Sequence, residues 1–99
     1  STILEKSFPS LNVLAEMLIE KKTWILLLRG HTDNIGDAQT NLLLSKNRVE
    51  VTKKYLVNKG VSKDSLILKY FGETKPIVKN NNALNRAINR RVEMEIIFD

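Results

Sequence analysis

The chain has 99 residues, enough for one domain, and its 42% hydrophobic and 27% charged residues are ordinary for a soluble globular protein. It contains no cysteine, which excludes disulfides and thiolate metal sites, and no apolar run approaches the ~18 residues that a membrane span needs. The net charge of +5 is compatible with an anionic partner such as nucleic acid. The lysines are spread along the chain, however, as they are on solvated surfaces, so nucleic acid is not the expected partner.

The first predicted helix and strand follow from the spacing of apolar residues. A helix is predicted over residues 8–21, with Ser7 as a candidate cap, and Ile3 and Leu4 could end an earlier strand. The apolar face of this helix consists of Leu11, Leu14, Ala15, Leu18 and Ile19. Residues 23–29 form an almost continuous apolar run, which is typical of a central strand covered on both faces or nearly so.

A polar loop and a long helix follow this strand. The loop spans residues 30–36, and Asp37 is well placed to cap a helix over residues 38–58. Gly60 lies where a helix end favours a left-handed backbone. The buried side of the helix is expected to carry Leu44, Val49, Thr52 and Leu56.

The remaining chain predicts a strand at residues 66–71, a short helix at 83–89 and a last strand at 91–98. Strand–helix–strand alternation favours parallel pairing, whereas the short connection before the last strand favours an antiparallel one. The predicted fold class is α/β. We expect a two-layer α/β sandwich with one mixed sheet and two long helices on one face.

The loop and the start of the long helix bring together side chains suited to one kind of ligand. Asp33 follows the apolar strand, and Arg48 lies about two helical turns after Asn41, on nearly the same face. An aspartate can bind an ammonium, while a guanidinium can bind a carboxylate with two hydrogen bonds. A ligand with an amino acid head group carries both charges. The alternative at this point is an Asp33–Arg48 salt bridge that only fastens the loop to the helix.

The sequence gives less support for metal binding, phosphate binding or catalysis than for this ligand. His31 is the only histidine, and with no cysteine a zinc site is not expected, so its predicted role is to hydrogen-bond or pack at the base of the loop. Neither a phosphate-binding glycine motif nor a nucleophile elbow is present, which argues against catalysis. Three arginines, Arg86, Arg90 and Arg91, form the only tight basic cluster. One of them is expected to be buried against an acidic partner such as Glu73, and another to face the ligand groove.

Several motifs together resemble one family, the OmpA-like C-terminal domain. They are Gly30-His31-Thr32-Asp33-Asn34-Ile35-Gly36, Asn41, Leu44-Ser45, Arg48, Tyr55-Leu56-Val57, Gly60-Val61, Gly72-Glu73, Pro76-Ile77, Asn80 and Asn89-Arg90-Arg91-Val92-Glu93. The resemblance covers about residues 8–97 in matching order and spacing. Peptidoglycan-associated lipoproteins and the periplasmic part of flagellar stator proteins belong to the same family.

The resemblance implies a βαβαβ-type OmpA-like fold in a single domain, residues 1–99, with the first strand of the family falling before Ser1. It implies a non-catalytic module without metal or cofactor that binds peptidoglycan through the diaminopimelate of the stem peptide. By position, Asp33 matches the residue that receives the ammonium and Arg48 the one that pairs with the carboxylate. The other implied site residues are Asn41, Thr32, Leu42 and Arg90.

The resemblance also implies where the module works. It would lie in the periplasm, tethered to the outer membrane, or less commonly the inner membrane, through the rest of a parent protein, with no insertion of its own into the bilayer. A homodimer is one expected assembly. The alternative function is an interaction or oligomerisation module of the same fold that does not bind peptidoglycan.

Overall fold

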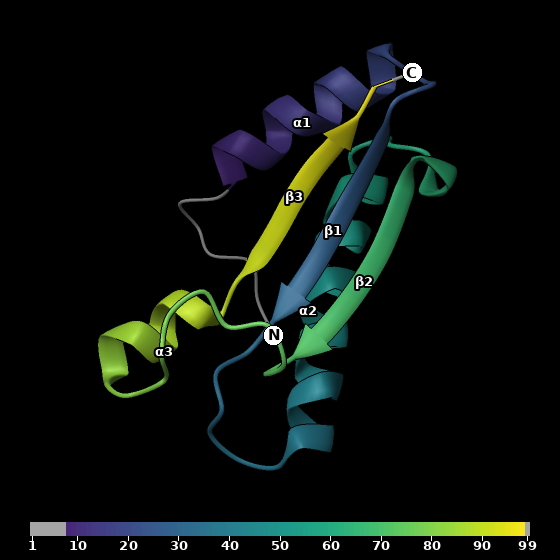
Figure 1. The fold of residues 1–99 in the computed structure, drawn as a ribbon. Helices are drawn as coiled ribbons and strands as arrows, with labels where there is room; N and C mark the ends of the chain where they lie inside the picture. Colours follow the sequence, from purple (N-terminus) through teal and green to yellow (C-terminus); the bar gives the residue numbers. More distant parts are fainter. Residues whose placement is uncertain (1–7, 99) are drawn as a thin grey trace.

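The structure, a computed structural model, describes residues 8–98 and contains three helices and three strands within that range (Figure 1). In chain order the elements are α1 (Phe8–Glu20), β1 (Ile25–His31), α2 (Ala38–Asn58), β2 (Leu66–Gly72), α3 (Ala83–Asn89) and β3 (Val92–Ile97). A 3-10 turn at Lys63–Ser65 precedes β2. The expected strand end at Ile3–Leu4 and the expected cap Ser7 lie outside the described residues. No helix within residues 8–98 is long and apolar enough to cross a membrane.

The sheet has the order β2-β1-β3, so β1 is the central strand. It pairs in parallel with β2, placing Leu26 opposite Leu66, and antiparallel with β3, placing Leu26 opposite Ile96. The two long helices, α1 and α2, lie on the same face of the sheet (Figure 1). The predicted two-layer α/β architecture with a mixed sheet is therefore confirmed.

The core lies between this face of the sheet and the two helices. Leu26 and Leu28 of β1 are fully buried there because alternate residues of a strand point to the same side. The other buried apolar residues are Leu11, Ala15, Leu18, Val49, Leu56, Val61 and Leu66. On the other face of the sheet Ile25, Leu27 and Arg29 of β1 are half-buried, so the prediction of a central strand covered on both faces, or nearly so, holds in part. On that face their neighbours Ile67 and Ile97 are 43% and 44% exposed.

The buried side of α2 differs from the predicted one at its first turns. Leu44 is 38% exposed, and the buried positions are instead Asn41, Ser45, Val49, Thr52 and Leu56. Polar residues are tolerated on this face because each has a partner. The Ser45 hydroxyl donates to the carbonyl of Leu42 at 2.7 Å and accepts the backbone N–H of Gly72 at 2.9 Å.

β1 continues two residues beyond its predicted end at Arg29, because Gly30 still pairs with both neighbouring strands. Gly30 also lies directly against α2. A Cβ at this position would be 2.3 Å from the Ser45 carbonyl oxygen, so only glycine allows the strand and helix to approach this closely. At the other end of α2, Gly60 has φ of +107°, which confirms the predicted left-handed residue after the helix.

Candidate ligand-binding site

The loop after β1 is held in place by hydrogen bonds to β2 and by its own side chains. Thr32 is 3% exposed. Its N–H donates to the Gly72 carbonyl at 2.8 Å, and its hydroxyl donates to the Asp33 carbonyl at 2.9 Å. The Asp33 carboxylate turns back onto the loop and accepts the N–H of Ile35 at 3.0 Å. These bonds place Asp33 at the carboxyl end of β1, where open α/β sheets usually bind ligands.

Asn41, in the first turns of α2, connects three segments of chain. Its side-chain amide donates to the carbonyls of Asp33 and Ile35 at 3.3 and 3.0 Å, and to the carboxylate of Glu73 at 3.2 Å. The residue is only 2% exposed. Asn41 therefore positions the loop, while Glu73 accepts an amide rather than pairing with an arginine as predicted.

The Asp33 carboxylate is closed off by Arg90, which follows α3. The Arg90 guanidinium donates to Oδ2 of Asp33 at 2.6 Å, and Asp33 is 7% exposed. Burial raises the pKa of Asp33, but the hydrogen bond from Ile35 and the charges of Arg90 and Arg86 outweigh it and leave the pKa below the ordinary value. Asp33 is thus an ionised carboxylate that already holds a cation.

Arg48 reaches the same end of the sheet from two turns further along α2. Its guanidinium donates to the His31 carbonyl at 2.8 Å. Burial and the neighbouring charge of Arg90 lower the pKa of Arg48, and the charge of Asp33 partly compensates. The simple Asp33–Arg48 salt bridge is not what the described residues form, because Asp33 pairs with Arg90 instead.

His31 packs and forms a hydrogen bond inside the domain, as predicted, but it is the last residue of β1 rather than part of the loop. Its imidazole is buried, stacks on Phe71 with ring centroids 5.4 Å apart, and lies 2.8 Å from the Glu93 carboxylate. Burial lowers the pKa of His31, helped by the charges of Arg91 and Arg29, while Glu93 opposes the shift. Arg91 best fits the predicted arginine held by an acidic partner, but it is half-buried and its partner is Glu93, at 3.4 Å.

The last predicted site residue, Leu42, is 41% exposed on the first turns of α2. Its backbone N–H lies against Gly72, at 3.0 Å from where a Cβ would stand. Leu42 therefore lies at the edge of the candidate site with a solvent-exposed apolar side chain. Within residues 8–98 no three histidine, aspartate or glutamate side chains gather closely enough to hold a metal ion.

Comparison with known proteins agrees with this architecture. The model of the OmpA family matches residues 1–90. This chain belongs to the OmpA family. Outer membrane porin F of Pseudomonas aeruginosa is 34% identical over 97 residues, which are 97% of this chain and 28% of that protein. The peptidoglycan-associated lipoprotein of Buchnera aphidicola is 33% identical over 82 residues, 83% of this chain and 47% of that protein.

A solved structure confirms the OmpA-like fold. The C-terminal domain of Helicobacter pylori MotB matches with a TM-score of 0.85 at 27% identity, covering 99% of this chain and 77% of that chain. The chain spans less than half of the length of both curated relatives named above.

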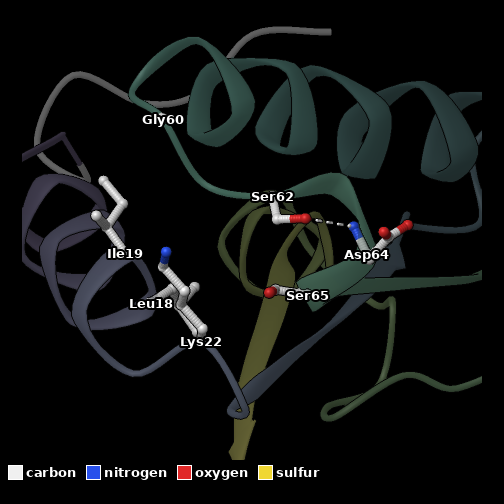
Figure 2. A pocket seen from close by; sticks show the side chains of 7 residues that line it. All are labelled: Leu18, Ile19, Lys22, Gly60, Ser62, Asp64 and Ser65. Carbon is white, nitrogen blue, oxygen red and sulfur yellow. Dashed lines mark hydrogen bonds between the residues drawn. The ribbon is translucent and has the colours of Figure 1, made fainter.

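This OmpA-family domain also has a cavity of about 520 Å³ between the end of α1 and residues 60–65 (Figure 2). Its lining residues are Leu18, Ile19, Lys22, Gly60, Ser62, Asp64 and Ser65. Ser62 and Ser65 precede β2, whereas Asp33 follows β1, and the two strands are parallel. In Figure 1 the turn before β2 and the loop after β1 lie at opposite ends of the sheet. The cavity is therefore at the end away from Asp33.

Proposed function

We propose that this OmpA-family domain binds peptidoglycan non-covalently and anchors a cell-envelope protein to the cell wall. One observation carries the proposal. A buried, ionised aspartate and two arginines converge at the end of the central strand, on a loop fixed by Thr32 and Asn41. A relative named for its association with peptidoglycan, the Buchnera lipoprotein, supports the same partner.

The proposed ligand group is the side-chain end of diaminopimelate, which carries an ammonium and a carboxylate. Asp33 would bind the ammonium and Arg48 the carboxylate. Because Arg90 occupies Asp33 in the free domain, the ammonium would have to replace it. The displaced guanidinium could then join Arg48 on the ligand carboxylate, so both ends of the zwitterion would be paired.

The proposed setting is the periplasm, with the domain tethered through the rest of a longer envelope protein. Outer membrane porin F and the lipoprotein among its relatives carry envelope names, which supports this location. The module would act by binding alone. Its contribution would be a reversible attachment between the parent protein and the wall.

The test is co-sedimentation with insoluble diaminopimelate-type peptidoglycan. Asp33→Ala and Arg48→Ala should each weaken binding by about 10- to 100-fold, because each leaves one charged end of the ligand unpaired. Asp64→Ala and Lys22→Ala remove the same charges at the opposite end of the sheet and should bind like the wild type. Thermal unfolding of all four variants checks that the fold is retained.

If the folded wild-type domain remains in the supernatant, the anchoring proposal is wrong. The alternative of an interaction or oligomerisation module would then be the better reading. Analytical ultracentrifugation of the same sample would show whether the domain self-associates. If the wild type sediments and the Asp33 and Arg48 variants sediment equally well, peptidoglycan binding stands but the proposed site does not.

A further inference from the structure

The end of the sheet away from Asp33 gathers lysines that are far apart in the sequence. β1 and β2 begin at this end, and β3 and the two long helices finish there (Figure 1). Lys21 and Lys22 connect α1 to β1, Lys59 directly follows α2, and Lys63 lies in the turn before β2. All four residues are exposed. We call these four residues the lysine end.

Positive charge exceeds negative charge at the lysine end. The carboxylates of the described residues here are those of Glu20, the last residue of α1, and Asp64, next to Lys63. None of the ion pairs within residues 8–98 involves either carboxylate or any of the four lysines. The Lys59 ammonium lies over the Tyr55 ring, 5.5 Å from its centroid, which leaves its charge in place. Four lysines against two carboxylates leave an excess of two positive charges.

Exposed apolar side chains lie at the same end of the sheet. Phe98 follows β3, is 62% exposed and contacts Trp24 edge to face, with ring centroids 4.5 Å apart. Ile97 pairs with the first residue of β1 and is 44% exposed. The N–H of Trp24 donates to the Lys21 carbonyl at 3.1 Å, and this bond closes the turn between α1 and β1. The turn therefore places two lysines directly beside the aromatic pair.

Lysines next to exposed aromatic and apolar side chains suit one kind of partner. At the surface of an anionic bilayer the ammonium groups approach the lipid phosphates, while the apolar groups enter the headgroup layer. Tryptophan in particular is enriched at this depth of a membrane. A soluble polyanion such as nucleic acid would attract the lysines but would not remove the neighbouring apolar side chains from water. A lipid surface does both.

We propose that the lysine end, together with Trp24 and Phe98, binds the surface of a bilayer that contains anionic phospholipids. The contact is peripheral, and it does not depend on the proposed peptidoglycan site. Asp33 lies beyond the other end of β1, whose seven residues span about 20 Å. Both ends of the domain are therefore accessible at once, one to a membrane and the other to a ligand.

Vesicle flotation and tryptophan fluorescence test this contact. The probes are vesicles of phosphatidylglycerol with phosphatidylethanolamine, and vesicles of phosphatidylcholine alone. The domain should float with the first and stay behind with the second. Trp24 is the only tryptophan of the chain, so its emission should shift to shorter wavelength on binding. Brominated acyl chains in the anionic vesicles should quench it.

A double variant of the turn measures the contribution of the lysines. Lys21→Gln with Lys22→Gln should weaken binding to the anionic vesicles about 20-fold, because each lysine near such a surface contributes roughly fivefold. The matched control is Lys75→Gln with Lys79→Gln. It removes the same charge from the segment after β2, at the Asp33 end, and should bind like the wild type. Peptidoglycan sedimentation of the Lys21 and Lys22 variant should equal that of the wild type.

Two single variants test the remaining features of the surface. Asp64→Asn removes a carboxylate beside Lys63 and should strengthen vesicle binding about fivefold, a gain that loss of folding cannot produce. Phe98→Ser should weaken vesicle binding about tenfold, because it removes apolar surface that would leave water. Thermal unfolding of each variant shows whether its fold is retained.

Four results would refute the proposal. The first is a wild-type domain that does not float with the anionic vesicles. The second is an equal loss of binding in the two double lysine variants, since net charge alone would then explain it. The third is binding without quenching of Trp24 by brominated lipid, because another surface would then face the bilayer. The fourth is complete release from the vesicles by a DNA duplex at equal phosphate concentration, which would indicate a general polyanion surface.

Discussion

The close approach of β1 and α2 at Gly30 leads to a quantitative prediction. In Gly30→Ala the new Cβ would be 2.3 Å from the Ser45 carbonyl oxygen and 2.9 Å from a Val49 methyl. Carbon–oxygen contacts normally begin near about 3.3 Å. The helix must therefore move away from the strand by roughly 1 Å, because the clashing oxygen belongs to backbone and cannot rotate aside.

The cost of this displacement can be estimated. Overpacking a well-filled core typically costs 1–3 kcal/mol, and a backbone clash belongs at the upper end, so we expect about 3 kcal/mol. For a domain of this size each kcal/mol lowers Tm by roughly 4–8 °C, which gives a decrease of about 12–24 °C. Urea unfolding and thermal unfolding followed by circular dichroism measure both quantities.

Gly36→Ala is the matched control for this experiment. Gly36 has φ of +89°, so alanine there is strained, but no atom lies within 4 Å of its Cβ position. The expected cost is only about 1 kcal/mol. If the two variants lose the same stability, or if Gly36→Ala loses more, crowding against α2 is not the reason for glycine at position 30.

Three further changes test other contacts. Burial lowers the pKa of His31, so the folded domain binds fewer protons than the unfolded chain below about pH 6.5. Its free energy of unfolding should therefore fall between pH 7 and pH 5, and His31→Gln should flatten that fall in urea titrations at the two pH values. Asn89→Ala removes a fully buried amide that bonds both the N–H and the carbonyl of Val78, and should cost roughly 3 kcal/mol in urea unfolding. Ser45→Ala leaves the Gly72 N–H without its acceptor and should cost about 1–3 kcal/mol without reducing peptidoglycan sedimentation.

The three helices and three strands could be predicted from the sequence, whereas strand ends that depend on long-range pairing could not. The range predicted for α2 is the observed one, because Asp37 caps it and Gly60 follows it in the left-handed region. The end of β1 was missed because Gly30 and His31 have the composition of a loop. They become strand only because β2 and β3 lie on both sides of them.

The same limit applies to the candidate site. Leucine at position 44 suggested a buried residue, whereas the buried positions nearby are Asn41 and Ser45, whose hydrogen-bonding partners come from other segments. Hydrophobicity alone cannot identify such positions. Likewise the spacing in the sequence suggested Arg48 as the partner of Asp33. The observed partner is Arg90, which is 57 residues away and lies next to Asp33 because β3 pairs with β1.

The Asp33–Arg90 pair has a consequence for which ligands the site can select. A simple amine could take the place of Arg90 on Asp33, but the released guanidinium would remain near Arg48, whose pKa is lowered by burial and, to a smaller extent, by the charge of Arg90. That exchange replaces one ion pair with another and leaves the Arg90 guanidinium without a carboxylate partner to offset its charge. A ligand with a carboxylate next to its ammonium, as in the proposed function, would supply the released guanidinium with a new partner and make the exchange favourable. Under that proposal Arg90 would act as an internal competitor that penalises amines and favours zwitterions, a form of specificity achieved by destabilising the wrong complex.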